Sequence, residues 1–170
     1  MTPSLALVAL PMLTAATASG AATFDLTELE SKVDLYCAQS VAADLLAGSK
    51  PLLQQLQART ADCHLRAVAV TVRLAREAPA ADSLPFTESL RLAVGKCTRF
   101  VLGLAMVAEA PRYCGSISVW SPAQTARELR RRIAALEADA LLRSTAAGEA
   151  CLAAYKYELT HTRVVLKRKA

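Results

Sequence analysis

Residues 86–107 repeat apolar side chains at alternating steps of four and three, which is the period of one face of an α-helix. A strand would need a period of two, so only a helix gathers these side chains on one buried face. The stripe consists of Phe86, Leu90, Ala93, Cys97, Phe100, Leu104 and Val107, with Val94, Val101 and Ala105 beside it. Its width predicts a central helix that other helices cover, and Pro111 predicts where it stops.

The rest of the chain also predicts helices. Proline, glycine and capping residues mark three further helical segments, at 27–47, 51–78 and 122–143, and a last one is expected over 145–159, although no proline marks its start. Thr27 and Glu30 have the spacing of a capping box, and Gly48 follows the first segment. Ser121 and Gln124 form a second capping box, with a proline at the first helical position between them. We therefore expect an all-α protein, a compact bundle of about five helices.

Composition excludes several other classes. Apolar residues make up 54% of the chain and charged residues 21%, which is too apolar for a disordered protein. Aromatic residues are only 5%, which argues against a β-sandwich or barrel. The chain has 6 glycines and carries neither of the glycine-rich phosphate-binding motifs, so a phosphate-cradling fold is not indicated.

The first 22 residues have the pattern of a cleaved secretory signal peptide. Residues 5–13 carry no polar side chain, small residues follow, and Asp25 is the first charged residue. An Ala-x-Ala site predicts a mature start at Ser19, and a second site of small residues predicts Thr23. N-terminal sequencing of the periplasmic protein distinguishes the two.

This pattern implies a domain organisation. The apolar run of the signal is shorter than the ~20 residues of a membrane span, and no second long apolar run follows. We expect a cleaved signal peptide at 1–22, a single helical domain at 23–160 and a solvated basic tail at 161–170. The expected location is the periplasm, with no membrane span.

The cysteines agree with export. All five lie beyond the signal and are widely spaced: Cys37, Cys63, Cys97, Cys114 and Cys151. The absence of a C-x-x-C motif argues against thioredoxin-like chemistry and zinc knuckles. Dispersed cysteines in an exported chain usually form disulfides, so all five are candidate disulfide cysteines. Because five is odd, at least one is free or joins a second copy of the chain in a homodimer.

The sequence lacks the residue combinations that the common catalytic sites require. The chain has two histidines, and His64 directly follows Cys63, so on one helix their side chains would point about 100° apart and cannot form a Cys–His pair. His161 with Glu158 is at most half of a metal site. We therefore expect no enzyme activity, no catalytic residue, no metal and no cofactor.

The net charge of +5 does not indicate nucleic-acid binding. The arginines that begin at Arg127 share their helical segment with Glu128, Glu137 and Asp139, and no aromatic residue lies among them. A solvated helix face with i,i+4 pairs, such as Glu128 with Arg132, explains them better. A basic protein is attracted to an acidic protein partner or an anionic envelope surface.

Five short segments of the chain together resemble the motifs of a known family. Residues 97–103 read Cys-Thr-Arg-Phe-Val-Leu-Gly and fit the pattern C-x-x-[YF]-[VI]-x-G. A Tyr-Cys pair stands at 113–114, Ser-Pro-Ala-Gln at 121–124, Ala-Tyr at 154–155 and Leu-Tyr-Cys at 35–37. Together they resemble the Rap/Tai family of immunity proteins. These small helical periplasmic proteins protect bacteria from peptidoglycan amidases injected by type VI secretion.

The resemblance implies a function. The chain would be an exported immunity protein that binds and inhibits an amidase effector, and such a protein needs a rigid scaffold but no catalytic group. The alternative is a periplasmic structural or adaptor protein without inhibitory activity. The candidate partner-binding loop carries Tyr113, Ser116, Ser118, Trp120 and Ser121. Trp120 is a candidate binding hot spot, or else it packs as the hydrophobic residue that precedes the helix cap.

The disulfide pairing stays open for the first three cysteines. If the first two helical segments form a hairpin about Gly48, Cys37 and Cys63 lie at similar depths and a bond between them is feasible. The family pattern instead implies that an upstream cysteine, Cys37 or Cys63, pairs with Cys97. The family pattern has Pro-Cys where this chain has Lys156-Tyr157. The cysteine nearest to that position is Cys151, one turn earlier in the last helix.

The positions of the last two cysteines, Cys114 and Cys151, predict a helix break. An unbroken helix over 122–143 would be about 30 Å long and would keep Cys114 and Cys151 beyond the ~7 Å Cα limit of a disulfide. A turn near Asp139 makes the two helical arms nearly equal and brings the sulfurs together. We therefore expect a break close to Asp139 together with a Cys114–Cys151 disulfide; a straight helix would exclude the bond.

Overall fold

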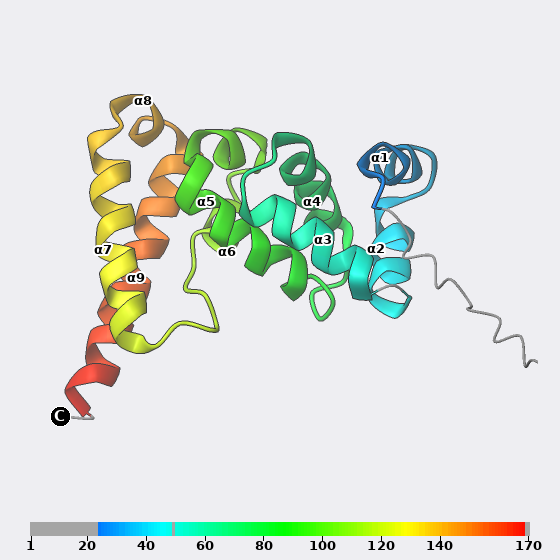
Figure 1. Cartoon of the computed structure of the whole chain (residues 1–170). Helices are drawn as coiled ribbons and strands as arrows, with labels where there is room; N and C mark the ends of the chain where they lie inside the picture. The colour runs from blue at the N-terminus through cyan, green and yellow to red at the C-terminus, as the bar shows by residue number, and fades with distance from the viewer. Residues whose placement is uncertain (1–23, 49, 169–170) are drawn as a thin grey trace, which may run out of the picture.

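The computed structural model describes residues 24–48 and 50–168, with side chains as far as Thr162. Within these ranges the chain forms nine α-helices and no strand, which confirms the all-α fold (Figure 1). The helices are α1 (Leu26–Leu35), α2 (Ala38–Ala47), α3 (Lys50–Ala61), α4 (Leu65–Glu77), α5 (Leu84–Leu104), α6 (Ala110–Tyr113), α7 (Pro122–Ala138), α8 (Ala140–Arg143) and α9 (Ala146–Arg168). The expected signal peptide, residues 1–22, lies outside the described residues.

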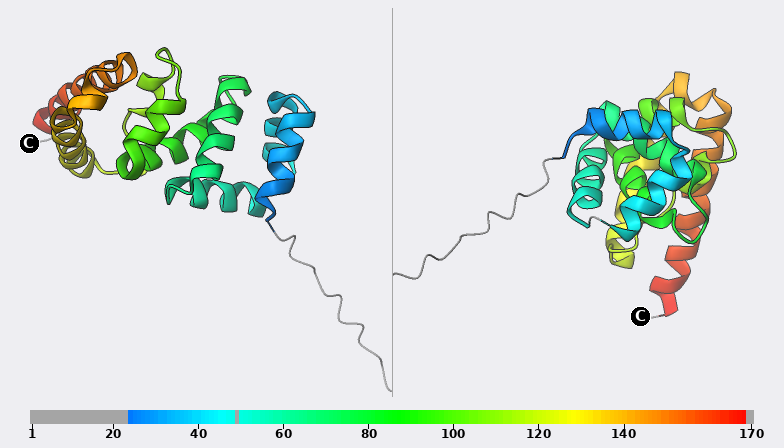
Figure 2. Two further views of the ribbon diagram at one scale, coloured as in Figure 1. Left: turned by 90° about the horizontal axis from the view of Figure 1, so that it is seen from above. Right: turned by 90° about the vertical axis from the view of Figure 1, so that its right-hand side faces the viewer.

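The helices succeed one another along a row. Figure 2 shows α1 and α2 at one end and α7 and α9 at the other, with α3, α4 and α5 between them. Helix α5 packs against α3, α4 and α6 and also touches α9, so it is the central helix that the apolar stripe predicted. Its side chains Phe86, Leu90 and Val101 are fully buried. The stripe ends earlier than expected, because α5 stops at Leu104 and Val107 is exposed in the following loop.

The segment expected as one helix over 27–47 is two helices. Tyr36 and Cys37 adopt extended backbone conformations between α1 and α2. The expected Thr27 cap is also wrong, since the carboxylate of Asp25 caps α1 and accepts the Thr27 N–H at 2.8 Å. Thr27 itself lies inside the first turn.

A second break changes the disulfide pairing. The segment expected over 51–78 separates into α3 and α4 at Cys63, whose φ of 63° lies in the left-handed region that side chains other than glycine rarely adopt. Cys63 bonds to Cys97 with a Cα–Cα distance of 6.1 Å, and Cys37 is free and exposed. The pairing Cys37–Cys63 is therefore wrong, and Cys63 is the upstream partner of Cys97.

The placement of α1 explains why Cys37 does not pair with Cys63. Helix α1 runs beside α4 in the same direction, because Arg66 contacts Thr27 and Glu30 near one end while Arg73 pairs with Asp34 near the other. Cys37 follows Asp34 and thus lies past the far end of this contact, away from Cys63. Helix α1 has 10 residues and is therefore about 15 Å long, which is beyond the reach of a disulfide.

The break expected near Asp139 is present. Helix α7 ends at Ala138, Asp139 separates it from α8, and its carboxylate accepts the Leu142 N–H at 3.1 Å as an N-cap. Cys114 and Cys151 are bonded, with a Cα–Cα distance of 5.2 Å, which confirms both parts of the expectation.

The last helix is longer than expected. Helix α9 runs from Ala146 to Arg168 and pairs with α7, so residues 161–168, expected as a tail, continue that helix. Within the described residues, no helix combines the length and the apolarity that crossing a bilayer requires.

Candidate functional site

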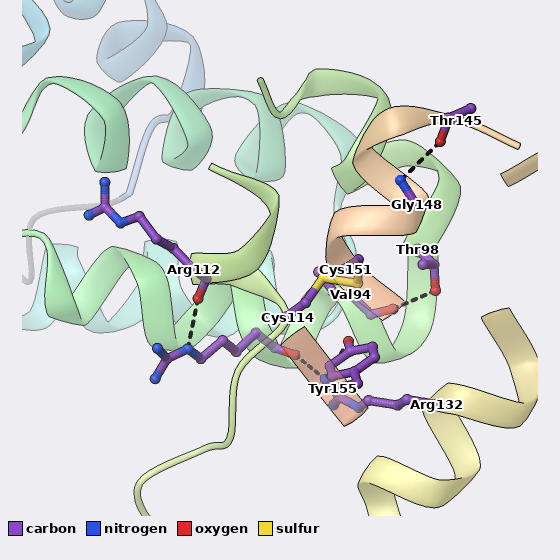
Figure 3. The surroundings of a disulfide bond; sticks show 10 residues. Val94, Thr98, Arg112, Cys114, Arg132, Thr145, Gly148, Cys151 and Tyr155 are labelled. Carbon is purple, nitrogen blue, oxygen red and sulfur yellow. Dashed lines mark hydrogen bonds between the residues drawn. A yellow bond between two sulfur atoms is a disulfide. The ribbon is translucent and has the colours of Figure 1, made fainter. Parts of the chain in front are cut away.

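The candidate partner-binding loop connects α6 to α7 and is fixed at its start by a disulfide. We call residues 114–121 the stapled loop. Cys114 follows α6 directly, is fully buried and bonds to Cys151, which is fully buried on α9 (Figure 3). The loop thus starts from two helices that the disulfide holds together.

Two side chains of α5 hold the loop backbone. Arg91 donates from Nε to the carbonyl of Arg112 at 3.0 Å and from a terminal nitrogen to the carbonyl of Ser116 at 3.0 Å. The same guanidinium pairs with Glu88, whose second carboxylate oxygen accepts the Ser118 N–H at 3.4 Å. Three backbone groups around the disulfide are therefore tied to the central helix, which leaves the loop little freedom to rearrange.

The end of the loop rests on a buried arginine of α7. Arg132 is only 6% exposed, and its guanidinium carbon lies 5.3 Å from the centre of the Trp120 ring, a cation–π distance. Arg132 also donates to the carbonyl of Arg91 at 2.6 Å and lies beside Tyr155 (Figure 3). Its charge is balanced by Glu128 one turn earlier, at 2.9 Å. This confirms the expected Glu128–Arg132 pair, but Arg132 is not part of a solvated face.

The five residues predicted for the loop lie in different environments. Tyr113 is fully buried at the end of α6, so it is not available as a contact surface and this part of the prediction is wrong. Burial, with the charge of Glu109, raises the pKa of Tyr113 to about 12. Ser118 and Ser121 are exposed, whereas Ser116 and Trp120 are half-buried. Ser121 caps α7 through the predicted capping box with Gln124.

The sequence did not single out the exposed apolar residue of the loop. Val119 is 84% exposed, while its neighbour Ile117 is 3% exposed and points into the protein. The alternation of serine with apolar residues over 116–120 gives no signal that distinguishes the two. Beside Val119 lies a groove of about 500 Å³, lined by Gln57, Ala58, Ala61, Leu84, Pro85, Glu88, Ser89, Leu92, Ile117, Ser118 and Val119. Leu84 at its edge is 54% exposed, so loop and groove form one partly apolar surface.

The helix that follows the loop adds positive charge. Arg127 and Arg130 are exposed on α7, and neither has an ion-pair partner within the described part of the chain. Arg131, beside them, is paired with Glu128 at 2.5 Å. The stapled loop therefore adjoins a basic helix face, which favours a partner with an acidic surface.

The paired cysteines of the described part of the chain offer this surface no thiolate. Cys63, Cys97, Cys114 and Cys151 are all in disulfides and supply no thiolate. His161 is on α9, where its ring nitrogen hydrogen-bonds to the Tyr157 carbonyl. Among the described residues, no group of three or more His, Cys, Asp or Glu is placed to hold a metal ion. The surface presents an apolar side chain, hydroxyl groups and arginines.

The chain was compared with known proteins at three levels. Searches against protein-family models, curated proteins and solved structures found no match. A functional assignment therefore depends on the geometry of the site and on the resemblance of its short motifs.

Neutralising Glu128 should destabilise the protein in a pH-dependent way. The Arg131 hydrogen bond and then that of Arg132 lower the pKa of Glu128 to about 2 although burial opposes them. The folded-state pKa is thus below the unfolded value, so the stabilisation is present above about pH 4.5 and is lost as the pH falls toward 2. We expect Glu128→Gln to lower the free energy of unfolding by about 2 kcal/mol at pH 7, because Arg132 loses its buried partner.

Urea unfolding of the variant and the wild type at several pH values tests this. The difference between them should shrink as the pH falls from about 4.5 toward 2. Glu149→Gln is the matched control, since Glu149 is exposed in the first turn of α9. A Glu128→Gln difference that is the same at pH 3 and pH 7 would contradict the electrostatic explanation.

Proposed function

We propose that the protein is an exported immunity protein that binds a peptidoglycan amidase effector in the periplasm and inhibits it. The stapled loop, the groove beside it and the basic face of α7 form the binding surface. A protein that blocks an enzyme's cleft gains affinity if its contact surface is rigid before binding, because little flexibility is then lost.

One observation carries this proposal. A loop that places Val119 almost wholly in solvent is fixed by the Cys114–Cys151 disulfide, by Arg91 and by Arg132. An exposed apolar residue on such a constrained loop contributes nothing to the core of this chain. It is suited to fill a pocket on a partner, with the exposed Ser118 available as a hydrogen-bonding group at the rim.

The resemblance of the motifs to Rap/Tai proteins supports the choice of partner. The two disulfides support export, because disulfides persist in oxidising compartments such as the periplasm. The signal-like sequence at residues 1–22 supports the same location.

The proposal is tested by expressing a candidate Cys–His amidase toxin in the periplasm with and without this protein. We expect the wild-type protein to prevent lysis and to bind the purified toxin. Val119→Asp should weaken binding by about 30-fold or more, as for a buried interface hot spot, and abolish protection. Calorimetric titration measures the affinity, and circular dichroism checks that the variant is folded.

Val107→Asp is the matched control, because Val107 is a 52% exposed valine in the loop after α5. It should bind and protect like the wild type. Protection that survives Val119→Asp would contradict the proposed surface. A wild-type protein that neither binds nor protects against any candidate amidase would favour the structural or adaptor alternative.

A further inference from the structure

A second groove lies at the other end of the molecule. It has a volume of about 530 Å³, and its lining includes Glu28, Leu29, Lys32, Val41, Asp44 and Leu45. Helices α1 and α2 supply most of the lining. Both lie at the opposite end of the row from α7 and α9 (Figures 1 and 2). This groove is therefore separate from the surface proposed for the effector.

The groove has an apolar floor and an acidic rim. Leu29, Val41 and Leu45 are at most 5% exposed and form part of the floor. Three carboxylates and one ammonium line the groove, so its rim is acidic in a chain whose net charge is +5. Such a rim repels anionic lipid and nucleic acid and attracts a cationic ligand.

The rim charges are not all neutralised within the protein. Lys32 pairs with Glu28 at 2.7 Å, and Asp25 is used as the cap of α1. Asp44 is exposed, and its carboxylate accepts no hydrogen bond within residues 24–48 and 50–162. Tyr36, between the two helices, is 63% exposed, so an aromatic side chain also stands at the rim without cover.

We infer that this groove binds a cationic amphipathic helix of a protein partner. Both walls are helices whose backbone groups are bonded internally, so the groove offers no free strand edge for an extended peptide. Affinity must therefore come from side chains, with apolar residues on the floor and a lysine or arginine facing the unpaired carboxylate of Asp44. A helix with an apolar face and a basic face supplies both sets at once.

Cys37 provides a reporter for the test. It is the one free cysteine of the described residues, it is exposed, and it directly follows Tyr36, which lines the groove. The full chain is purified from the periplasm, and its Cys37 is labelled with an environment-sensitive thiol-reactive fluorophore. The probe is an 18-residue helical peptide of leucine and lysine with one apolar face, and the control peptide carries glutamate in place of lysine. We expect the lysine peptide to shift the fluorescence and to bind at least about tenfold more tightly than the glutamate peptide.

Two variants locate the binding. Asp44→Lys should weaken binding of the lysine peptide by about tenfold, whereas Asp82→Lys, the same charge change at an exposed loop position, should not. Ser40→Trp fills the groove from its rim without changing a charge and should also abolish binding. Equal binding of both peptides, or binding unaffected by Ser40→Trp, would overturn the inference. A dimer, detected by sedimentation, that binds the peptide only after dilution would also overturn the inference. In that case a second copy of the chain would occupy the groove.

Discussion

Replacing Cys114 and Cys151 together with alanine should lower the free energy of unfolding by about 4 kcal/mol and abolish protection by the protein. The two cysteines are 37 residues apart, and a cross-link over a loop of this length stabilises by about that amount if it acts by restricting the unfolded chain. The loss of function has a second cause. The bond also fixes the start of the stapled loop, so its removal lets the loop leave the geometry that Arg91 supports.

The other disulfide separates these two effects. Cys63 and Cys97 are 34 residues apart, so replacing both with alanine should cost a similar free energy of unfolding, about 4 kcal/mol. That bond joins the start of α4 to α5 and does not touch the stapled loop. At a temperature where both variants are folded, we expect only the Cys114→Ala/Cys151→Ala variant to lose affinity for the effector. Equal losses of affinity would show that the loop depends on global stability alone.

Local signals in the sequence predicted the elements that depend on local chemistry. The first part of the α5 stripe has a helical period because its residues share one buried face, and Phe86, Leu90 and Ala93 are fully buried. The backbone departs from helical geometry at Cys97, so α5 is kinked there, which the period did not predict. Ser121 caps α7 because a serine followed by proline and glutamine satisfies the first free N–H groups of a helix in any context. The break at Asp139 was predicted from the length of a helix and the reach of a disulfide, which are also independent of context.

The breaks that the sequence did not predict depend on tertiary packing. No proline or glycine marks Tyr36–Cys37 or Cys63, and a left-handed conformation at Cys63 is unfavourable for a residue with a side chain. The disulfide to Cys97 and the packing of α1 against α4 compensate for it. Such compensation involves residues far apart in the sequence, so periodicity within one segment carries no sign of it.

In the candidate site, too, the sequence predicted some features and missed those that depend on tertiary packing. The position of the loop and its serines followed from the sequence, but the burial of Tyr113 and Arg132 did not. An arginine among other arginines on α7 has no local feature that marks it as buried. Its burial follows from the approach of α5 and α9, which supply the Arg91 carbonyl and the Tyr155 ring.

Replacing Gly148 with alanine should lower the free energy of unfolding by about 3 kcal/mol, because the space for a side chain is already occupied by backbone. A Cβ at Gly148 would overlap the carbonyl oxygen of Leu142 and lie 2.8 Å from its carbonyl carbon. The Gly148 N–H also donates to Thr145 Oγ1 at 3.0 Å, which fixes the first turn of α9 against the turn before it (Figure 3). Unlike the end of a flexible side chain, this carbonyl cannot move aside without shifting α8 or α9.

Gly103→Ala is the matched control for this change. Gly103 is exposed near the end of α5, and a Cβ there would meet no atom within 4 Å. Alanine at such a helical position should raise the free energy of unfolding by about 0.5–1 kcal/mol. Urea unfolding measures both variants. Because Cys151 follows Gly148 by one turn, a shift of α9 should also leave Cys114 and Cys151 partly unbonded, which thiol titration after denaturation detects. A Gly148→Ala protein that keeps wild-type stability and a single free thiol would show that α8 and α9 separate more easily than this packing implies.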